Sequence, residues 1–382
     1  MSSPQTPIIQ GWCPGALRPM LSGDGLVLRI RPRRGRLTQD QARGIAALSA
    51  QHGNGLIDLS ARANVQLRGV TEASHPRLIE GLRALDLIDA SADAEARRNI
   101  IVTPFWTAQD PTQRLVDELA QALAAAEAPA LPGKFGFAID TAATPVLRDV
   151  SADIWLESGP DGLLLATHSP LAKPVTVESA IAEAIALAHW FIENGGVTEG
   201  RGRMAALLNR VDLPAGFTAN RLPPMPEPKL GMMPQGQLVA FEFGQMQAET
   251  LAQLADLGAL RVTPWRMLLI EGATTAPEIQ GLITRADDPM LRVIACTGAP
   301  GCLQAHTATR PLARSLAPKL SQVLHISGCA KGCAHPSAAP YTLTATVSGF
   351  DLIRNGIASG APTRQGLSAA DLLETTLFTE TE

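Results

Sequence analysis

A pattern of strands and helices occurs twice in this chain, and such a duplication limits the fold more than any single segment does. The first copy starts at Gly25, with GLVLRIRPRRGRLTQDQARGIAALSAQHGNGLIDLSARANVQLRGV. The second starts at Gly236, with GQLVAFEFGQMQAETLAQLADLGALRVTPWRMLLIEGA. Each copy predicts a strand, a turn, an amphipathic helix and two more strands, because apolar residues alternate in the strand segments, as at Leu59, Val65 and Leu67. Chance similarity between ordinary α+β segments is the alternative explanation.

The segments that follow the two copies also resemble each other. RNIIVTPFW runs into the helical PTQRLVDELAQALAAAEA, as LRVIACTGAPGC runs into HTATRPLARSLAPKL. We therefore expect an α+β fold with the order A-B-A′-B′, and a proline-rich linker between its halves. The predicted parts are half-domains at 11–85 and 235–288, α/β modules at 95–212 and 289–382, and the linker at 213–234.

The composition excludes several classes of protein. The 382 residues are 46% hydrophobic and 18% charged, which is typical of a globular protein, and the net charge of −4 favours neither nucleic acid nor an anionic membrane as a partner. No run of about 18 apolar residues predicts a membrane-spanning helix. The first residues, MSSPQTPIIQGWCPG, lack the layout of a secretory signal, so we expect a cytoplasmic protein.

Four of the five cysteines lie close together in the sequence and predict a metal centre. Cys296 and Cys302 form a C-x5-C pair, and Cys329 and Cys333 form a C-x3-C pair. Four thiolates from two loops suit a [4Fe–4S] cluster, in which each iron takes one cysteine. The loops are rich in glycine and proline, which lets the backbone approach the sulfur atoms. The first half has Thr103 where the second half has the first of these cysteines, so only the second module is expected to hold the cluster.

Two other uses of these cysteines stay open at this stage. Structural zinc favours short C-x2-4-C knuckles in both pairs, so the C-x5-C pair fits zinc poorly. Burial as small apolar side chains is the remaining possibility.

With this cysteine spacing, the A-B-A′-B′ order and the LRVTPWRMLLIEG block, the chain resembles the nitrite and sulfite reductase superfamily. The resemblance implies that the half-domains pair as a ferredoxin-like pseudo-dimer and that the second α/β module carries a [4Fe–4S] cluster. In that superfamily the last cysteine of the C-x3-C pair commonly bridges the cluster to sirohaem iron, and Cys333 holds that place here.

The same resemblance implies basic and polar residues around a central tetrapyrrole. Two segments match the superfamily, LRIR and LSARANVQLRGV, and they carry the candidate residues Arg29, Arg31, Arg62, Asn64, Gln66 and Arg68. Alternate residues of a strand share one face, so we expect the last four to point together. The alternative is the polar, solvent side of an amphipathic strand.

One motif departs from the reductases of this superfamily. Where they have two lysines in a KFK motif facing the haem, this chain keeps Lys134 but has Gly136 at the second position. Losing one cation should weaken the binding of sulfite or nitrite, because charge-assisted bonds dominate such sites.

The opening GWCPGALRPMLSGDGLVLRIRPRRGRLT resembles instead the precorrin-3B synthase branch of the superfamily. That resemblance implies a monooxygenase of aerobic cobalamin biosynthesis, which hydroxylates precorrin-3A at C-20 and forms a γ-lactone. It also implies O2, NADH, a [4Fe–4S] cluster and further iron or sirohaem. A tetrapyrrole polycarboxylate needs arginines, and the first half-domain supplies seven candidates: Arg29, Arg31, Arg33, Arg34, Arg36, Arg62 and Arg68.

Several further expectations complete the sequence-based hypothesis. No G-x-G-x-x-G motif follows a predicted strand, so electrons from NADH should arrive through a separate reductase. His306 and His335 are candidate ligands of a further iron, Cys13 is expected to be a small buried side chain, and no catalytic residue is assigned. We expect the site to lie between the halves, lined by arginines and capped by the cluster. A sirohaem-dependent reductase and an electron-carrying subunit without chemistry of its own are the alternatives.

Overall fold

The computed structural model describes residues 13–374 and Phe378. The chain forms two compact units. One contains Leu26–Thr284 and the residues just before Leu21, and the other contains Leu21–Gly25 and the residues from Arg285 onward. Positions 11 and 12 of the first predicted half-domain, and 375–377 and 379–382 of the last predicted module, lie outside the described residues.

The first half-domain consists of an antiparallel sheet with helices on one side. Leu28 and Ile30 are fully buried, as alternation predicts for a strand with one face on the core. The long helix begins with a capping box, in which Thr38 and Gln41 exchange hydrogen bonds. Its elements are β1 (Met20–Ser22), β2 (Gly25–Ile30), η1 (Arg33–Gly35), β3 (Arg36–Leu37), α1 (Gln39–His52), β4 (Leu56–Leu59), β5 (Val65–Val70), α2 (His75–Ala84) and α3 (Ala92–Arg97).

The second half-domain repeats this order. Both copies turn after their first strand through a residue with a left-handed backbone, Arg34 in one and Phe243 in the other. The repeated elements are β12 (Gly231–Met233), β13 (Gly236–Phe241), η2 (Glu242–Gly244), β14 (Gln245–Gln247), α7 (Ala248–Leu257), β15 (Leu260–Val262), β16 (Met267–Glu271) and β17 (Leu282–Ile283).

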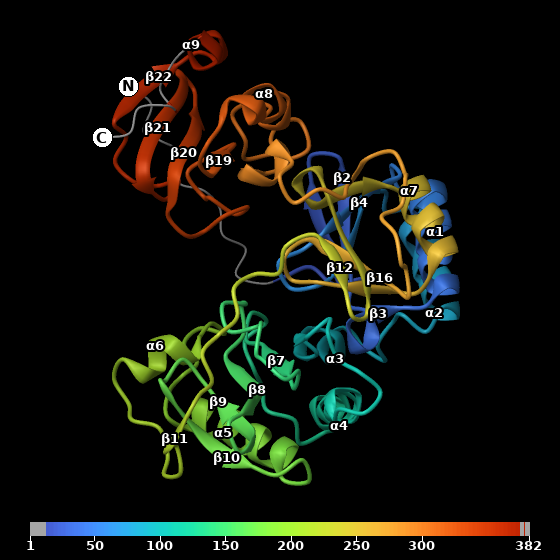
Figure 1. Ribbon diagram of the computed structural model, residues 1–382, viewed down its shortest axis with the longest axis vertical. Coiled ribbons are helices and arrows are strands. Elements are labelled where there is room, and N and C mark those ends of the chain that lie inside the picture. The colour runs from blue at the N-terminus through green and yellow to red at the C-terminus, as the bar shows by residue number, and fades with distance from the viewer. Residues whose placement is uncertain (1–12, 375–377, 379–382) are drawn as a thin grey trace. The chain divides into compact units, whose positions relative to one another are not determined.

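The two half-domains exchange their short strands. Strand β14 of the second copy pairs with β4 of the first, and β3 of the first copy pairs with β15 of the second. The sheets therefore have the orders β1-β2-β5-β4-β14 and β12-β13-β16-β15-β3. Helices α1, α2 and α7 lie on the same side of both sheets (Figure 1). This exchange produces the predicted pseudo-dimer, and the α+β fold class is confirmed.

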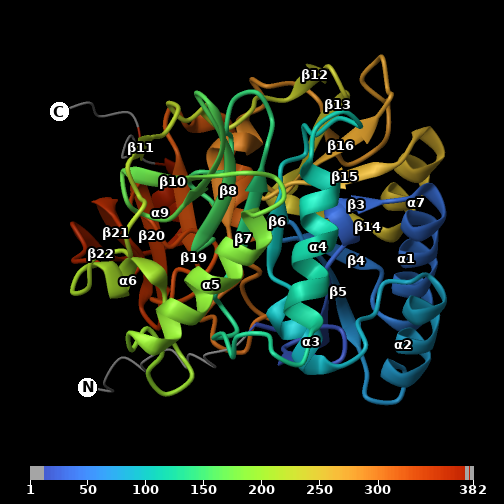
Figure 2. The same cartoon turned by 90° about the horizontal axis from the view of Figure 1, so that it is seen from below.

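The first α/β module follows the first half-domain. Strands β6, β7 and β8 are parallel and the later ones antiparallel, in the order β11-β10-β9-β8-β7-β6. Helices α4 and α5 lie against this sheet (Figure 2). They bury Leu115, Leu119 and Phe191 in the core of the module. Its elements are β6 (Ile100–Val102), α4 (Thr112–Ala124), β7 (Phe137–Asp140), β8 (Ile154–Gly159), β9 (Gly162–Ala166), β10 (Leu171–Val175), α5 (Ala180–Glu193), α6 (Met204–Leu208) and β11 (Ala219–Asn220).

The second α/β module repeats this strand order, but its sheet has five strands where the first has six. Strands β18, β19 and β20 are parallel, and β21 and β22 continue the sheet in antiparallel order. Its elements are η3 (Pro289–Arg292), β18 (Val293–Ala295), α8 (Arg310–Leu316), η4 (Ala317–Lys319), β19 (Leu324–Ser327), β20 (Ala339–Thr346), β21 (Gly349–Gly356), β22 (Arg364–Leu367) and α9 (Ala369–Glu374). Among the helices of the described chain, none has the length and apolar character needed to cross a membrane.

Candidate functional site

The four clustered cysteines lie in two loops at one edge of the sheet in the second module. Cys296 follows β18 directly, and Cys329 follows β19 after one glycine. These strands are parallel neighbours, so their carboxyl ends, and the loops that continue to Cys302 and Cys333, meet at the same edge. All four are free thiols in the structure.

Hydrogen bonds join the two cysteine loops. The amide of Gly328 donates to Cys296 Sγ at 3.1 Å, and the amide of His306 donates to the Gly328 carbonyl at 2.8 Å. The hydroxyl of Thr309 donates to the Cys296 carbonyl at 2.7 Å. An N–H donated to a cysteine sulfur is the kind of contact that orients and tunes a metal-bound thiolate.

Glycine allows this close approach of the loops. A Cβ on Gly328 would lie 2.7 Å from the Ala305 Cβ and 3.4 Å from Cys296 Sγ, so a larger residue would separate the loops. Gly332, inside the C-x3-C pair, has φ +62°, a conformation that side chains disfavour.

Burial and the neighbouring thiols raise the pKa of two of these cysteines, Cys329 and Cys333. Burial raises the pKa of Cys329, and Cys302 and Cys296 raise it further. Cys333 is exposed, but the protein around its sulfur and the other three thiols together raise its pKa to about 11. Four thiols held this close are a donor set suited to a positively charged iron cluster, which they would bind as thiolates.

The described residues offer a less suitable site for a single metal ion than for a [4Fe–4S] cluster. No group of three or more His, Cys, Asp or Glu side chains in that part of the chain converges to hold one ion. A [4Fe–4S] cluster has a different requirement, because its cysteines bind separate irons. Near these loops, the rings of His325 and His335 contact each other at 5.6 Å, while His306 is exposed.

In the larger unit, Arg29 and Gln66 form a hydrogen-bonded pair across two strands. They are directly opposite each other on β2 and β5. Arg29 Nε donates to Gln66 Oε1 at 3.0 Å, and Nη2 donates to the same oxygen. Gln66 therefore fixes the orientation of the Arg29 guanidinium.

Arg31 directly follows the same strand and is 4% exposed. Burial lowers its pKa to about 10, although the carboxylate of Glu95, 3.5 Å away, opposes the shift. Its Nε donates to Asn99 Oδ1 at 3.3 Å. Arg31 is thus a buried cation with a single carboxylate beside it.

Arg62 and Asn64 do not lie on the strand with Gln66, so the prediction that four residues alternate along one strand is wrong. Strand β5 begins only at Val65, and both residues belong to the preceding turn, where a tight β4–β5 connection replaces the expected extended backbone. Arg62 Nη2 instead reaches the first module, where it donates to the Lys134 carbonyl at 2.8 Å and to Ser151 Oγ at 2.9 Å.

Gly136 lies beside the Arg62 guanidinium. A Cβ at this position would lie 3.3 Å from Arg62 Nη1 and 3.2 Å from the Ser151 carbonyl oxygen. The missing side chain thus leaves room for an arginine from another part of the chain. Lys134, two residues earlier, is exposed.

Arg68 forms a buried ion pair with Asp58 inside the sheet. It is 5% exposed and donates to Asp58 Oδ2 at 3.1 Å, while Gln245 donates to the other oxygen of Asp58 at 2.7 Å. Its charge is therefore largely balanced within the sheet.

Arg203 is a further basic residue of this region, and no pattern in the sequence analysis predicted it. Its Nη1 donates to Ser151 Oγ at 3.4 Å, the hydroxyl that Arg62 also contacts, and its Nε donates to Asp153 at 2.9 Å. Burial lowers the pKa of Arg62, and the charges of Arg203 and Arg29 lower it further. Arg203 lies in the glycine-rich segment GGVTEGRGRM, and this composition was the one local feature that could have drawn attention to it.

Cys13 also lies beside these arginines. It is partly buried, and it contributes an interaction that favours the charged forms of Arg29, Arg31 and Arg62. The sequence predicted only a small buried side chain here, because proximity to β2 and to the β4–β5 turn depends on the tertiary fold.

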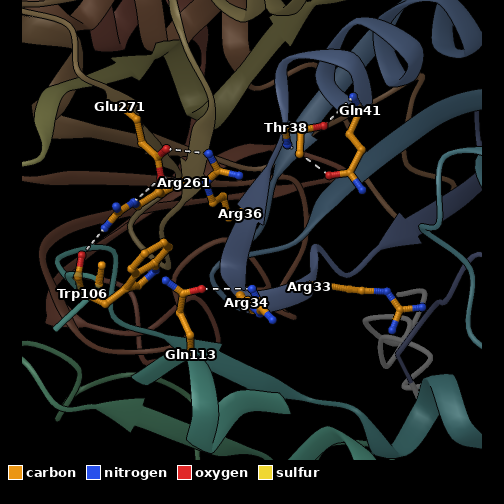
Figure 3. Close-up of a pocket in the computed structure, with 10 residues that line it drawn as sticks. Arg33, Arg34, Arg36, Thr38, Gln41, Trp106, Gln113, Arg261 and Glu271 are labelled. Carbon is orange, nitrogen blue, oxygen red and sulfur yellow. Dashed lines mark hydrogen bonds and ion pairs between the residues drawn. The ribbon is translucent and has the colours of Figure 1, made fainter. Parts of the chain in front are cut away.

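Three other candidate arginines line a different pocket of about 500 Å³ (Figure 3). Arg36 and Arg261 share the carboxylate of Glu271, at 2.8 and 2.7 Å. Arg261 also stacks on the Trp106 ring, 3.7 Å from its centroid. These contacts join the second half-domain to the first module. The arginines of the first half-domain in this pocket are Arg33, Arg34 and Arg36.

Comparison with known proteins identifies the family. Residues 18–85 match the nitrite/sulfite reductase ferredoxin-like half domain. A precorrin-3B synthase from Sinorhizobium sp is 30% identical over 393 residues, covering 92% of this chain and 84% of the relative. The chain belongs to the precorrin-3B synthase family. The resemblance predicted from the cysteine spacing and the repeat is confirmed.

Two further comparisons are with a nitrite reductase and with a protein of similar structure. A ferredoxin–nitrite reductase from Synechococcus elongatus is 25% identical over 397 residues, covering 84% of this chain and 76% of the relative. The Mycobacterium tuberculosis NirA protein has a similar structure, with a TM-score of 0.64 over 91% of this chain and 79% of that one, at 19% identity. This second likeness concerns the fold alone.

Proposed function

We propose that this chain is a precorrin-3B synthase, which hydroxylates precorrin-3A at C-20 while the ring A acetate closes a γ-lactone. The reaction belongs to aerobic cobalamin biosynthesis. As a monooxygenase reaction it balances with one O2, two electrons and two protons. One oxygen atom enters the tetrapyrrole and the other leaves as water.

The observation that carries the proposal is the group of guanidiniums around Arg29. The charge of Arg29 lowers the pKa of both Arg31 and Arg62, and the charge of Arg203 also lowers the pKa of Arg62. The carboxylates paired with this group are those of Glu95, beside Arg31, and Asp153, beside Arg203. The excess of positive charge suits a ligand with several carboxylates, which arginine forks bind in a bidentate manner.

The individual residues have different proposed roles. Arg29, Arg31 and Arg62 bind substrate carboxylates, and Gln66 positions Arg29. Asn64, Arg68 and Lys134 complete the proposed tetrapyrrole-binding set. Of these, Arg68 contributes mainly through the sheet, because Asp58 already balances its charge.

The cysteines Cys296, Cys302, Cys329 and Cys333 are the proposed ligands of a [4Fe–4S] cluster, whose chemistry is one-electron transfer. The amide of Gly328, which donates to Cys296 Sγ, supports this assignment. NADH is the proposed source of electrons through a separate reductase, and His306 and His335 are the proposed candidates for binding a further iron.

The alternative is a sirohaem-dependent sulfite or nitrite reductase. The similarity to a nitrite reductase, at 25% identity, supports this alternative. The surroundings of Gly136 favour the synthase. The space beside it is occupied by Arg62, whose donors are directed to Lys134 and Ser151.

The test is an anaerobic visible spectrum with iron and sulfide analysis, followed by an assay with precorrin-3A. We expect a broad shoulder in the blue, roughly four irons and four sulfides per chain, and no strong haem bands. Precorrin-3A with O2 and a reductant should then gain one oxygen atom by mass spectrometry. Strong sirohaem bands, with reduction of sulfite or nitrite and no change in precorrin-3A, would establish the alternative instead.

A further inference from the structure

We propose that the turn at Ser22 and Gly23 is a clamp that positions the loop between Cys296 and Cys302 for the cluster. The turn joins β1 to β2, and it belongs to the same compact unit as the cysteine loops. The inference rests on the proposed cluster and assigns positioning residues to it that lie far away in the sequence.

Two hydrogen bonds connect the turn to the loop. Ser22 Oγ donates to the Gly301 carbonyl at 2.6 Å, and the amide of Gly23 donates to the same oxygen at 3.2 Å. This carbonyl directly precedes Cys302 in the chain. Two donors on one oxygen restrict the peptide plane from which the cysteine side chain starts.

The contact is also close enough to require glycine. A Cβ on Gly23 would lie 2.0 Å from the Pro300 carbonyl oxygen and 3.1 Å from the Gly301 carbonyl carbon. Both are backbone atoms, which cannot rotate away as the end of a side chain can. Any larger residue at this position must push the loop or the turn aside.

The two cysteines of this pair differ in how the sheet supports them. Cys296 continues β18, and its amide donates to the Ile326 carbonyl at 3.2 Å. Cys302 lies six residues further along, in a loop, where its amide donates to the Gly298 carbonyl at 2.8 Å. The clamp gives this part of the loop an anchor outside its own segment.

The main test compares iron release in Ser22→Ala, Ser22→Thr and Gly23→Ala with wild type, in the whole protein, using an iron chelator and the visible absorbance. Loss of the Ser22 hydrogen bond should speed iron release about fivefold, and Ser22→Thr should restore the wild-type rate. Gly23→Ala should speed release on the order of tenfold or more, because backbone atoms must move. The midpoint potential of the cluster should also shift in the same two alanine variants.

Gly133→Ala is the matched control, because a Cβ there meets no atom within 4 Å. It should release iron at the wild-type rate. Wild-type rates and potentials in both Ser22→Ala and Gly23→Ala would overturn the clamp. Should Gly23→Ala fail to fold, Ser22→Ala and its threonine counterpart decide the question alone.

A second measurement separates the clamp from the proposed cluster. In protein stripped of iron, the amides of Gly301, Cys302 and Leu303 should exchange with deuterium about fivefold faster in Ser22→Ala than in wild type. Wild-type protein that never holds a cluster would refute the cofactor assignment, and the exchange experiment would still test the clamp. Unchanged exchange would overturn the clamp whatever the cofactor.

Discussion

Asp58 and Arg261 occupy equivalent positions in the two half-domains and carry opposite charges. Asp58 on β4 is paired with Gln245, and Arg261 on β15 is paired with Arg36, through the exchanged strands. Each forms an ion pair within its own sheet, Asp58 with Arg68 at 3.1 Å and Arg261 with Glu271 at 2.7 Å. The duplication thus keeps the geometry of the pair and reverses its polarity.

The ion pairs of Glu271 with Arg261 and Arg36 should contribute to the free energy of unfolding. Burial works against its ionisation, but the hydrogen bonds from Arg36 and Arg261 lower its pKa. Glu271→Gln should lower the free energy of unfolding by about 2 kcal/mol, since it leaves two guanidiniums without their shared carboxylate. Urea unfolding measures this. The control Asp287→Asn breaks an exposed pair with Arg285 and should have no measurable effect.

The orientation of Arg29 should depend on Gln66. Gln66→Ala removes the oxygen that accepts two bonds from this guanidinium, and hydrogen bonds to charged groups are the stronger ones. The dissociation constant for precorrin-3A should therefore rise about tenfold, measured by absorption titration, with the iron content unchanged. Gln253→Ala, on the exposed face of α7, is the control and should bind like wild type. Equal affinity of the Gln66 and Gln253 variants would remove Gln66 from the site.

The cysteine assignment predicts an all-or-none difference among variants. Serine at Cys296, Cys302, Cys329 or Cys333 should abolish the cluster absorbance and the activity, because in each variant one iron loses its thiolate. Cys13→Ser should retain the wild-type content of iron and sulfide, since Cys13 lies beside Arg29. Full cluster absorbance in any of the first four variants would show that the ligand set is wrong.

The space beside Gly136 is predicted to be needed for Arg62. In Gly136→Ala the new Cβ would be 3.2–3.3 Å from the Ser151 carbonyl and the guanidinium, so Arg62 must shift. Overpacking of this size costs about 1 kcal/mol, and precorrin-3A binding should weaken about fivefold. Gly133→Ala, three residues away in open space, should bind normally. Binding unchanged in both variants would mean that Arg62 has no part in it.

Asp140 should make stability depend on pH. Burial raises its pKa from 3.8 to about 6, although the amides of Val146 and Leu147 donate to its Oδ2 at 2.6 and 2.7 Å. The folded protein keeps this proton to a higher pH than the unfolded chain. The free energy of unfolding should therefore fall by up to about 3 kcal/mol between about pH 4 and pH 6, and stay level above.

Asp140→Asn should remove that fall, because the asparagine carbonyl can still accept both amides and no longer titrates. Unfolding curves between pH 4 and pH 8 measure the difference. The exposed control Asp149→Asn should keep the wild-type pH dependence. A wild-type slope in Asp140→Asn would assign the dependence to other groups.

The order of elements could be predicted from the sequence because it depends on local patterns. Alternation of apolar residues predicts strands such as β5, where Val65 and Leu67 are buried. The spacing of the cysteines, together with the glycines around them, indicates the candidate cluster in the same way. The repeat strengthens the prediction of each element, since a pattern found twice is stronger evidence than one found once.

The neighbours of individual side chains were decided only by the tertiary structure. The exchange of β3 and β14 places Gln245 against Asp58 from 187 residues away. Seven arginines that look equivalent in the sequence separate into a group around Arg29, an internal pair at Arg68 and the pocket around Arg36, while Arg203 joins the first group. Sequence periodicity reports which face of an element is apolar. Which charged groups then meet depends on strand register and on packing between distant segments, and no local pattern encodes these.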